Sequence, residues 1–302
     1  MSMEETATTV RPTEPQPRIA RRKKRRFSTK SVIWFIVMIV SVSLVLYPIV
    51  WVVFASFKPS SEFGSNMSMV ADNPTINNYI KVLEGIAGVP LWRFFGNSLI
   101  LAVGAVVGTV ISASMAAYAF ARVRFRGNAV FFSLMIGTLL LPFHVLIIPQ
   151  YIIFNKLGLL DTFVPLLIGK FLAADAFFVF LMVQFIRSLP KEMDEAARID
   201  GAGHVRVYFS IVVPLIRPAL ITSSIFAFIW SWNDFLGPLL YLNSTENYPL
   251  PLALRLYNDT TSVSDYGATV AISVLALVPV AIFFLIFQRF LVEGVATQGL
   301  KG

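Results

Sequence analysis

Several side chains of this sequence could bind a solute, because they are polar or charged and fall inside long apolar runs. They are His144, Lys170, Asp175, Gln184, Asn233 and Asp234. A charged or amide side chain costs free energy in a bilayer, and where one occurs it commonly lines a path for a solute or an ion. These residues are therefore the first candidates for a transport path.

Two of them lie within the aromatic stretch Trp230-Ser-Trp-Asn-Asp-Phe235. A flat indole ring beside an amide and a carboxylate suits sugar binding, because the ring stacks on C–H groups and the polar atoms bind hydroxyls. We therefore take Trp230, Trp232, Asn233 and Asp234 as candidates for a substrate path. An aromatic belt with a polar cap is an equally good interpretation of this stretch.

Lys170 and Asp175 are also candidates for the substrate path, and their spacing predicts that they do not pair with each other. Residues five positions apart differ by about 140° around a helix that turns roughly 100° per residue. Each charge would then need a partner on another helix. Interhelical contacts, or an outward reach of the Lys170 side chain, would explain these charges without any transported solute.

The segment 187–214 is a charged island between two apolar runs, and its first half predicts a short helix. Ser188 or Leu189 can cap this helix. Pro190 would lie in the first turn, where its missing N–H has no intrahelical partner to lose. Acidic residues follow at the positive end of the helix dipole, where they are favourable.

One face of this predicted helix could receive another protein. Met193, Ala196 and Ala197 recur at helical spacing and form a nearly flat surface, with the carboxylate of Glu195 beside it.

The helix should end where Asp200 is followed by Gly201, because glycine adopts the positive φ that a sharp turn needs. An amphipathic linker that lies on the membrane surface without a partner is the simpler interpretation of the whole segment.

Several kinds of catalytic chemistry are missing from the sequence. It contains no Gly-x-x-x-x-Gly-Lys-Ser/Thr phosphate loop, so the chain cannot by itself be an ATPase. It has no cysteine, only the two histidines His144 and His204, and no Gly-x-Ser-x-Gly turn. We therefore expect neither an enzyme nor a metal site, and no cofactor bound by this chain.

The composition indicates a membrane protein. Of the 302 residues, 56% are hydrophobic and 14% are charged, whereas about a quarter of the residues of an average soluble domain are charged. Six apolar runs of about 20 or more residues are long enough to cross a bilayer, and they predict an all-helical fold with six transmembrane helices. The runs are approximately Ser31–Phe57, Phe94–Ala121, Ala129–Gln150, Phe163–Ile186, Leu215–Leu242 and Tyr266–Phe290.

These runs define the predicted domains. Residues 1–30 contain a block of consecutive Lys and Arg and are expected to form a disordered basic tail. Residues 31–290 form the six-helix domain, and residues 291–302 form a C-terminal tail. Because the basic block adjoins an apolar run, a role in membrane topology explains it better than nucleic-acid binding does.

The distribution of Lys and Arg predicts the orientation in the membrane. With the N-terminus inside, the inner segments 1–30, 122–128, 187–217 and 289–302 hold nine, three, five and two of the 25 Lys and Arg residues. Positive charge accumulates on the cytoplasmic side of membrane proteins. Both termini and the segment 187–214 are therefore predicted to be cytoplasmic.

The order of residues in this cytoplasmic segment resembles a known signature. Glu195-Ala-Ala is followed after three residues by Gly201, and after nine more by Ile211-Val-Val-Pro214. This spacing is similar to that of permease subunits of ABC importers, in which Leu stands where this chain has Val213. In that family the segment is a coupling helix that docks into a groove of the ATPase subunit. The resemblance implies docking roles for Met193, Glu195, Ala196, Ala197, Asp200 and Gly201.

Further stretches resemble the carbohydrate-type permeases, and among them the maltose-permease-like branch. They are Pro142, Pro149, Leu157-Gly-Leu159, Thr162, Trp232-Asn-Asp-Phe235, Gln288-Arg289, Gly294 and Lys301-Gly302. The resemblance covers about residues 31–302. The stretch Val295–Leu300 departs from the ending of the maltose subunit itself, which leaves the particular sugar open.

The resemblance implies a fold, a set of partners and a mechanism. The fold would be that of a type I ABC importer permease in the cytoplasmic membrane of a prokaryote. The partners would be a second homologous permease, two cytosolic ATPase subunits that bind ATP and Mg²⁺, and an extracytoplasmic substrate-binding protein. Together they would import a sugar or oligosaccharide by alternating access.

An ion-coupled secondary transporter of small solutes is the alternative from another class. Asp175 and Asp234 could serve as its buried carboxylates, but no inverted repeat is apparent in the sequence. Such a carrier would work without ATP and without other subunits.

Overall fold

The computed structural model describes residues 29–64, 68–259 and 265–299, which form helices joined by loops. Apart from one isolated bridge between Ile86 and Val89, this described part of the chain contains no β-structure. The predicted all-helical class is therefore confirmed. The N-terminal tail is predicted to be disordered over residues 1–30. Residues 1–28 of this tail lie outside the described part of the chain.

The chain divides into two units, residues 1–48 and 49–302. Most of helix α1 (Thr29–Ala55) belongs to the first unit. Its side chains from residue 30 to residue 48 are all exposed and carry a single charge, that of Lys30. A helix that is apolar on every side and has no buried face is suited to a lipid environment.

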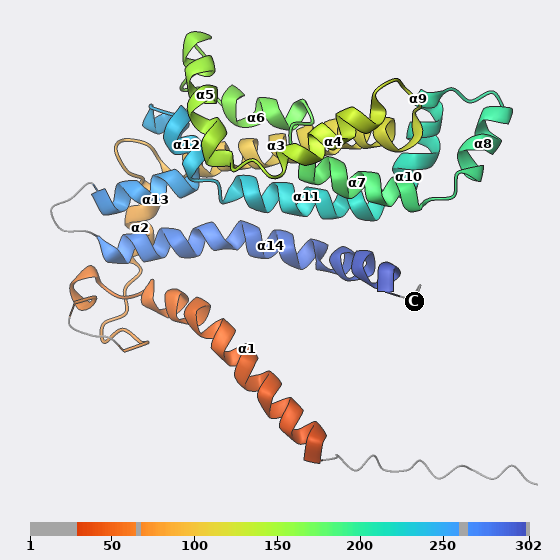
Figure 1. Cartoon of the computed structure of the whole chain (residues 1–302). Helices are drawn as coiled ribbons and strands as arrows, with labels where there is room; N and C mark the ends of the chain where they lie inside the picture. The colour runs from red at the N-terminus through yellow and green to blue at the C-terminus, as the bar shows by residue number, and fades with distance from the viewer. Residues whose placement is uncertain (1–28, 65–67, 260–264, 300–302) are drawn as a thin grey trace, which may run out of the picture. The chain divides into compact units, whose positions relative to one another are not determined.

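The second unit contains the remaining helices (Figure 1). They are η1 (Ser60–Glu62), α2 (Asn77–Glu84), α3 (Leu91–Arg122), α4 (Asn128–Thr138), α5 (Phe143–Lys156), α6 (Val164–Phe171), α7 (Ala176–Ser188), α8 (Glu192–Ile199), α9 (His204–Val207), the π-helical turn η2 (Tyr208–Val212), α10 (Val213–Leu215), α11 (Arg217–Trp232), α12 (Leu236–Tyr241), η3 (Thr245–Asn247), α13 (Leu250–Asp259) and α14 (Tyr266–Gly299). Helix α14 continues through most of the predicted C-terminal tail, and its last described residue is Gly299.

Helix α3 is central to this unit, because it packs against α6, α7 and α11. Helix α11 packs in turn against α14 (Figure 1). Helices α8 to α10 lie at one end of these long helices, and α2, α12 and α13 lie at the other. The charged segment 187–214 is therefore gathered at a single end, as its position between two apolar runs predicts.

Four of the six predicted crossings correspond to described segments that are long and apolar enough on their own. The predicted crossing Leu215–Leu242 overlaps one half of a pair of helices bent by 76°, which has the length and apolarity of a span only if the pair is counted as one. The segments are Lys30–Ala55, Leu91–Arg122, Val164–Ser188, Tyr266–Gln288 and the pair His204–Leu215 with Arg217–Trp232.

The predicted crossing Ala129–Gln150 differs, because it is divided into α4 and α5. Pro142 precedes the first residue of α5. Proline lacks the N–H of a continuous helix, and it restricts the preceding residue to extended backbone. Neither piece alone has the length of a span, so the sixth crossing stays a prediction.

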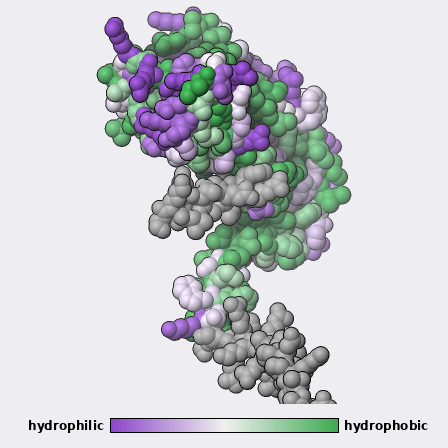
Figure 2. Space-filling view, turned by 90° about the vertical axis from the view of Figure 1, so that its right-hand side faces the viewer, coloured by the Kyte–Doolittle hydropathy of each residue, from purple (hydrophilic) through white to green (hydrophobic). Residues whose placement is uncertain are grey.

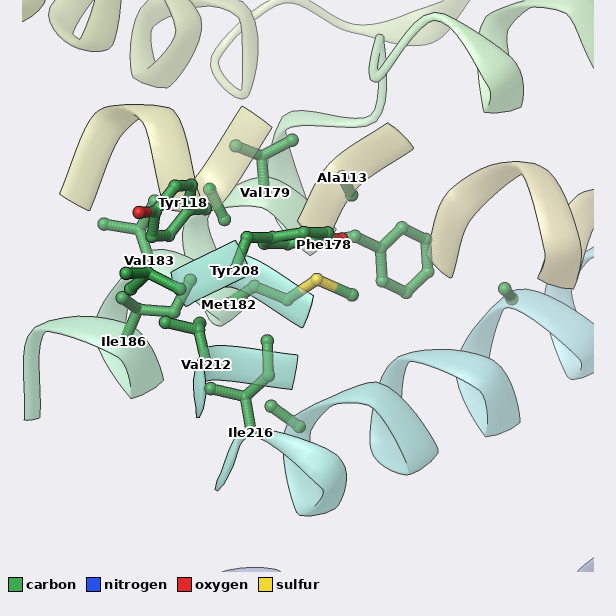
Figure 3. Close-up of a cluster of buried hydrophobic side chains, with 14 residues drawn as sticks. Ala113, Tyr118, Phe178, Val179, Met182, Val183, Ile186, Tyr208, Val212 and Ile216 are labelled. Atoms are coloured by element: carbon green, nitrogen blue, oxygen red, sulfur yellow. The ribbon is translucent and has the colours of Figure 1, made fainter. Parts of the chain in front are cut away.

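Two clusters of buried apolar side chains hold the second unit together. The first lies at the end that carries α8 to α10, and it joins α3 and α7 to the chain that leads into α11 (Figure 3). Phe178 and Met182 of α7 are among its fully buried members. The second cluster lies towards the other end and joins α2, α3, α11, α13 and α14. In it the rings of Phe228 and Phe283 stack with centroids 4.0 Å apart.

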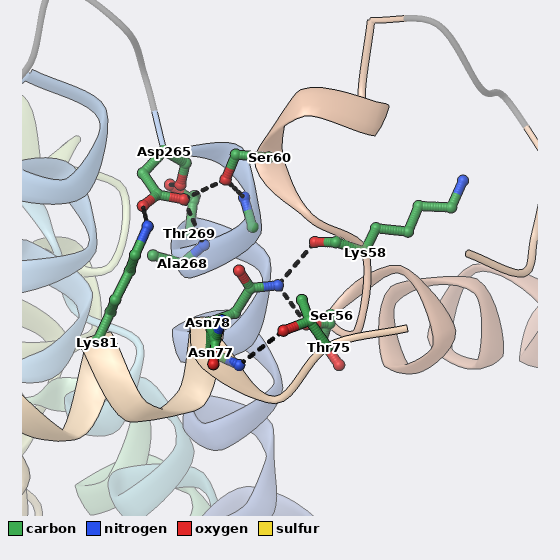
Figure 4. Close-up of polar contacts among 11 residues, drawn as sticks. Ser56, Lys58, Ser60, Thr75, Asn77, Asn78, Lys81, Asp265, Ala268 and Thr269 are labelled. Atoms are coloured by element: carbon green, nitrogen blue, oxygen red, sulfur yellow. Dashed lines mark hydrogen bonds and ion pairs between the residues drawn. The ribbon is translucent and has the colours of Figure 1, made fainter. Parts of the chain in front are cut away.

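A buried asparagine joins α2 to the chain that follows α1 (Figure 4). The Nδ2 of Asn78 donates to the carbonyl oxygen of Ser56 at 2.8 Å and to that of Lys58 at 2.7 Å. These bonds satisfy two carbonyls that no helix pairs, which a buried backbone requires.

Asp265 joins the same region to the start of α14. Its carboxylate accepts hydrogen bonds from Lys81 Nζ at 2.8 Å and from Ser60 Oγ. Burial raises the pKa of Asp265, but the hydrogen bonds from Lys81 and Ser60 outweigh burial and hold the pKa below its usual value.

Asp161 fastens the connection between α5 and α6 to the chain after α12. Its carboxylate accepts hydrogen bonds from the N–H of Asn243 and of Ser244, both at 2.9 Å, and from Ser244 Oγ at 2.5 Å. The slight burial of Asp161 raises its pKa, but the bonds from Ser244, Asn243 and Asn247 lower it to about 2.

Gly267→Ala should destabilise the junction of α2 and α14. An added Cβ would lie 2.5 Å from Oδ1 of Asn78, whose buried side chain cannot move without breaking its hydrogen bonds. The expected loss is about 1–3 kcal/mol of unfolding free energy, measured as a lower thermal midpoint of the purified protein in detergent. Gly96→Ala is the control, since no atom lies within 4 Å of its added Cβ. An unchanged midpoint for Gly267→Ala would contradict this prediction.

Asp161→Asn should lower the thermal midpoint in a pH-dependent way. Asparagine tolerates the positive φ of 59° at this position, so the substitution tests the charge. Because the folded pKa of about 2 lies below the 3.8 of an aspartate in the unfolded chain, the carboxylate stabilises the fold fully above about pH 4 and loses its effect as the pH falls towards 2. The difference between wild type and variant should be equal at pH 7 and 5 and smaller at pH 3. A difference that is constant down to pH 3 would rule this explanation out.

Candidate functional site

A cavity of about 200 Å³ lies between α3, α6 and α11, close to the end of α11. It brings together three of the residues predicted for the substrate path, Lys170, Trp230 and Asp234. The remaining lining residues are Leu101, Leu166, Ser231 and Pro238. A cation, a carboxylate and an indole therefore face one volume, which is the combination that the sequence analysis associates with sugar hydroxyls and C–H faces.

The prediction that Lys170 and Asp175 do not pair is wrong. Lys170 Nζ lies 2.7 Å from Asp175 Oδ2, and the two side chains are 27% and 35% exposed. The estimate of their angular separation assumed one continuous helix. Helix α6 ends at Phe171 and α7 begins at Ala176, and the connection turns through Ala173 with a φ of 53°. This turn brings the two charges together.

The break between α6 and α7 is held by α3. Ser112 Oγ donates to the carbonyl oxygen of Lys170 at 2.6 Å and accepts the N–H of Ala173 at 3.1 Å. The same face of α3 carries Gly104 and Gly108, where an added Cβ would lie 3.1 Å from Leu167 and from the Lys170 backbone, respectively. Small residues thus let the broken helix approach closely enough for Ser112 to satisfy it.

Two other predicted path residues point away from the cavity. Trp232 is 2% exposed and belongs to the second apolar cluster, where its Nε1 donates to the carbonyl oxygen of Ala276 at 3.2 Å. Its ring stacks on that of Phe228. Asn233 is exposed and its side chain donates to the carbonyl oxygen of Ile229. Neither residue lines the cavity, because successive residues at the end of a helix face different directions.

Asp234 and Trp230 each have a structural contact besides lining the cavity. Asp234 Oδ1 accepts the N–H of Gly237 in the first turn of α12 at 3.1 Å. The ring of Trp230 packs on Phe177 and Phe178, with centroids 5.3 and 5.2 Å away. These contacts fix the orientation of both side chains towards the cavity.

The segment 187–214 forms the short helix that the sequence predicts, with a different start. Helix α8 begins at Glu192 and its N-cap position is Lys191. The predicted caps are wrong, because Ser188 is the last residue of α7 and Leu189 follows it. Pro190 belongs to this connection and not to the first turn of α8.

The end of α8 is the predicted one. Gly201 has a φ of 82°. Its N–H donates to the carbonyl oxygen of Arg198 at 3.0 Å, and the N–H of Ala202 donates to that of Ala197 at 2.9 Å. This pair of bonds is a Schellman motif, which needs a left-handed residue directly after the helix. Asp200 and Gly201 therefore end the helix for the expected reason.

The predicted flat face of α8 is only partly exposed. Met193, Glu195 and Ala196 are exposed, whereas Ala197 packs against the first apolar cluster. The exposed side also carries Ile199, 86% exposed, which the sequence analysis missed. Its position three residues after Ala196 was the available signal. Figure 2 shows hydrophilic side chains gathered at this end.

A second residue that the sequence analysis missed is Asp194, which forms an ion pair with Arg122 at the end of α3. The Nε of Arg122 lies 2.9 Å from Oδ2 of Asp194, and the side chains are 4% and 9% exposed. A cavity of about 750 Å³ adjoins the pair, lined by residues of the α3–α4 connection and of α8.

Comparison with known proteins identifies the family of this chain. The model of the family described as "Binding-protein-dependent transport system inner membrane component" matches residues 108–297. The chain belongs to this family. It is therefore a permease, a component of a transport system and not an enzyme.

Relatives of this permease match it over most of its length. The arabinooligosaccharides transport system permease protein AraQ of Halalkalibacterium halodurans is 34% identical over 262 residues, 86% of this chain and 92% of that protein. The diacetylchitobiose uptake system permease protein NgcG of Streptomyces coelicolor is 31% identical over 287 residues, 93% of this chain and 91% of that protein.

The fold of the permease is also similar to a solved structure. A chain from the crystal structure of a bacterial ABC transporter involved in the import of the acidic polysaccharide alginate matches with a TM-score of 0.75 at 26% identity. The match covers 87% of this chain and 98% of that chain. Among the described residues, no group of three or more His, Cys, Asp or Glu side chains is placed to hold a metal ion.

The contact between Lys170 and Asp175 should appear as energetic coupling. Lys170→Met and Asp175→Asn each leave one charge unpaired, whereas the double variant leaves none. The double variant should therefore lose less unfolding free energy than the two single variants lose together. The difference, the coupling energy, should be about 0.5–3 kcal/mol. The measurement is thermal or denaturant unfolding in detergent. Lys170→Met combined with Asp161→Asn is the control pair, and its effects should add. Additive effects for Lys170 and Asp175 would contradict the ion pair.

Proposed function

We propose that this permease carries a sugar or oligosaccharide across the cytoplasmic membrane by alternating access, driven by separate ATPase subunits. The observation that carries the proposal is the exposed side of α8, an ordered helix at one end of the bundle in a chain that has no nucleotide site of its own. The names of the relatives support a sugar, since AraQ is described for arabinooligosaccharides and NgcG for diacetylchitobiose.

The proposed docking site for an ATPase subunit is the loop around α8. Glu195 offers an exposed carboxylate beside Met193 and Ala196, and Ile199 adds an apolar side chain. Asp200 and Gly201 end the helix and set its length. Ala197 is also predicted to dock, but its side chain packs against the first apolar cluster and so joins α8 to the bundle.

The proposed partners follow from the family description and the chemistry of this chain. A binding-protein-dependent system includes a substrate-binding protein, which would meet the end of the bundle opposite α8. Two ATPase subunits would bind ATP and Mg²⁺, and a second homologous permease would complete the path. Both termini of this permease are proposed to be cytoplasmic, because inner segments hold most of the Lys and Arg.

The proposed substrate path passes the cavity between α3, α6 and α11. Lys170 and Asp234 supply polar contacts there and Trp230 supplies an apolar ring, while Asp175 orients Lys170 through the ion pair. An ion-coupled carrier that uses Asp175 and Asp234 is the weaker alternative, because the family is defined by its dependence on a binding protein.

Glu195→Arg should separate ATP hydrolysis from transport. The side chain is exposed, so the variant should insert and fold, but reversal of its charge should disrupt contact with the ATPase. We expect a loss of sugar-stimulated ATPase activity in the reconstituted complex, with unchanged amounts of permease in the membrane. Co-purification of the ATPase subunits is measured as well, and it should fall in Glu195→Arg but not in the charge-matched control Glu84→Arg, whose side chain is exposed at the opposite end of the bundle. Full stimulation in Glu195→Arg would refute the proposed docking role.

A further inference from the structure

Three residues of α3 spaced four apart contact the loop that contains α8. Ser114, Tyr118 and Arg122 therefore form a stripe along one side of the helix. Ser114 Oγ lies 2.7 Å from Tyr208 Oη in η2. Tyr118 Oη lies 3.3 Å from Nδ1 of His204, the first residue of α9. The part of the loop that returns to the bundle is thus bound to the last turns of α3.

Arg122 binds the part of the loop that leaves the bundle. Its Nε pairs with Asp194 in the first turn of α8, and its Nη2 donates to the carbonyl oxygen of Leu189 at 2.8 Å. One guanidinium therefore holds both the end of α7 and the start of α8. The guanidinium can do so because its nitrogens are separate: Nη2 makes the hydrogen bond, whereas Nε meets Asp194 as an ion pair without hydrogen-bond geometry.

Besides this ion pair, Arg198 of α8 forms a hydrogen bond with Tyr118 of α3. The cavity of about 750 Å³ separates much of α8 from the α3–α4 connection, and Ala197 is the residue of α8 that packs on the first apolar cluster. A buried ion pair is seldom needed for stability, since apolar residues of similar volume often stabilise a fold as well. What the charged pair adds is an electrostatic link between the end of α3 and the first turn of α8.

We infer that Arg122 and Asp194 are positioning residues that transmit the movement of α8 to α3 and thereby to the cavity. Leu101 of α3 lines that cavity, and it precedes Arg122 by about 32 Å of helix at 1.5 Å per residue. A displacement of the last turn of α3 therefore reaches the cavity wall through one continuous helix. This inference rests on the proposed function, in which an ATPase moves α8.

The test needs no knowledge of the sugar, because the chain contains no cysteine. Ser231→Cys places a single, nearly isosteric thiol in the cavity. The complex that co-purifies with the permease is reconstituted, and the rate at which a maleimide labels this thiol is measured with and without MgATP plus vanadate. In the otherwise unchanged chain, the nucleotide should alter the rate by about five- to 150-fold, the range of ordinary coupling between sites.

Asp194→Asn should abolish this nucleotide response while the ATPase subunits still co-purify. Glu192→Gln, an exposed carboxylate of the same helix, is the matched control and should keep the response. The exchanged pair Arg122→Asp with Asp194→Arg should restore it, which a general loss of stability would not explain. Arg122→Lys should give an intermediate response, because an ammonium is a point charge without the planar fork.

A response of wild-type size in any assembled variant that lacks the ion pair would overturn the inference. So would an exchanged pair that assembles but responds no better than Asp194→Asn. If Asp194→Asn does not assemble, Arg122→Gln takes its place as the variant without the ion pair, and the same two criteria apply. Absence of any nucleotide response in the complex whose permease carries only Ser231→Cys would instead overturn the proposed function, and the inference with it.

Discussion

Inside a bilayer no water bonds a free backbone group, so each break in a helix has to be satisfied by the protein. In this permease Ser112 does so at the break between α6 and α7, where it binds the backbone of Lys170 and Ala173. Gly104 and Gly108 let the broken helix lie against α3 closely enough for this contact. The continuous helix α3 is therefore the support on which the discontinuous helices are arranged.

The same break provides the chemistry of the cavity. Because the chain turns at Ala173, Lys170 and Asp175 neutralise each other at a depth where single charges would be costly. Lys170 also lines the cavity with Trp230 and Asp234. An interrupted helix thus places polar side chains inside a membrane domain while α3 keeps its backbone satisfied. Packing of Trp230 on two phenylalanines holds the apolar part of this cavity in place.

The opposite end of α3 meets a different constraint. Helix α8 is short and largely exposed, and a helix of this length is marginal without tertiary contacts. Its contacts include the buried pair of Asp194 with Arg122, the packing of Ala197 and the Schellman end at Gly201. Each leaves Met193, Glu195 and Ala196 exposed. The residues that hold α8 in place are therefore largely different from those proposed to dock, although both kinds occur within the same eight-residue helix.

The sequence alone determined the properties that depend on local pattern. Long apolar runs set the helical class, the spacing from Glu195 to Pro214 indicated the family, and Gly201 marked the end of α8, because hydropathy and backbone preference are local. Contacts between distant segments were decided only by the tertiary structure. The pairing of Lys170 with Asp175 depends on a helix break, the burial of Trp232 depends on α14, and Asp194 meets an arginine 72 positions earlier in the chain. Helical spacing relates residues within one helix, whereas a break or a neighbouring helix changes which side chains meet.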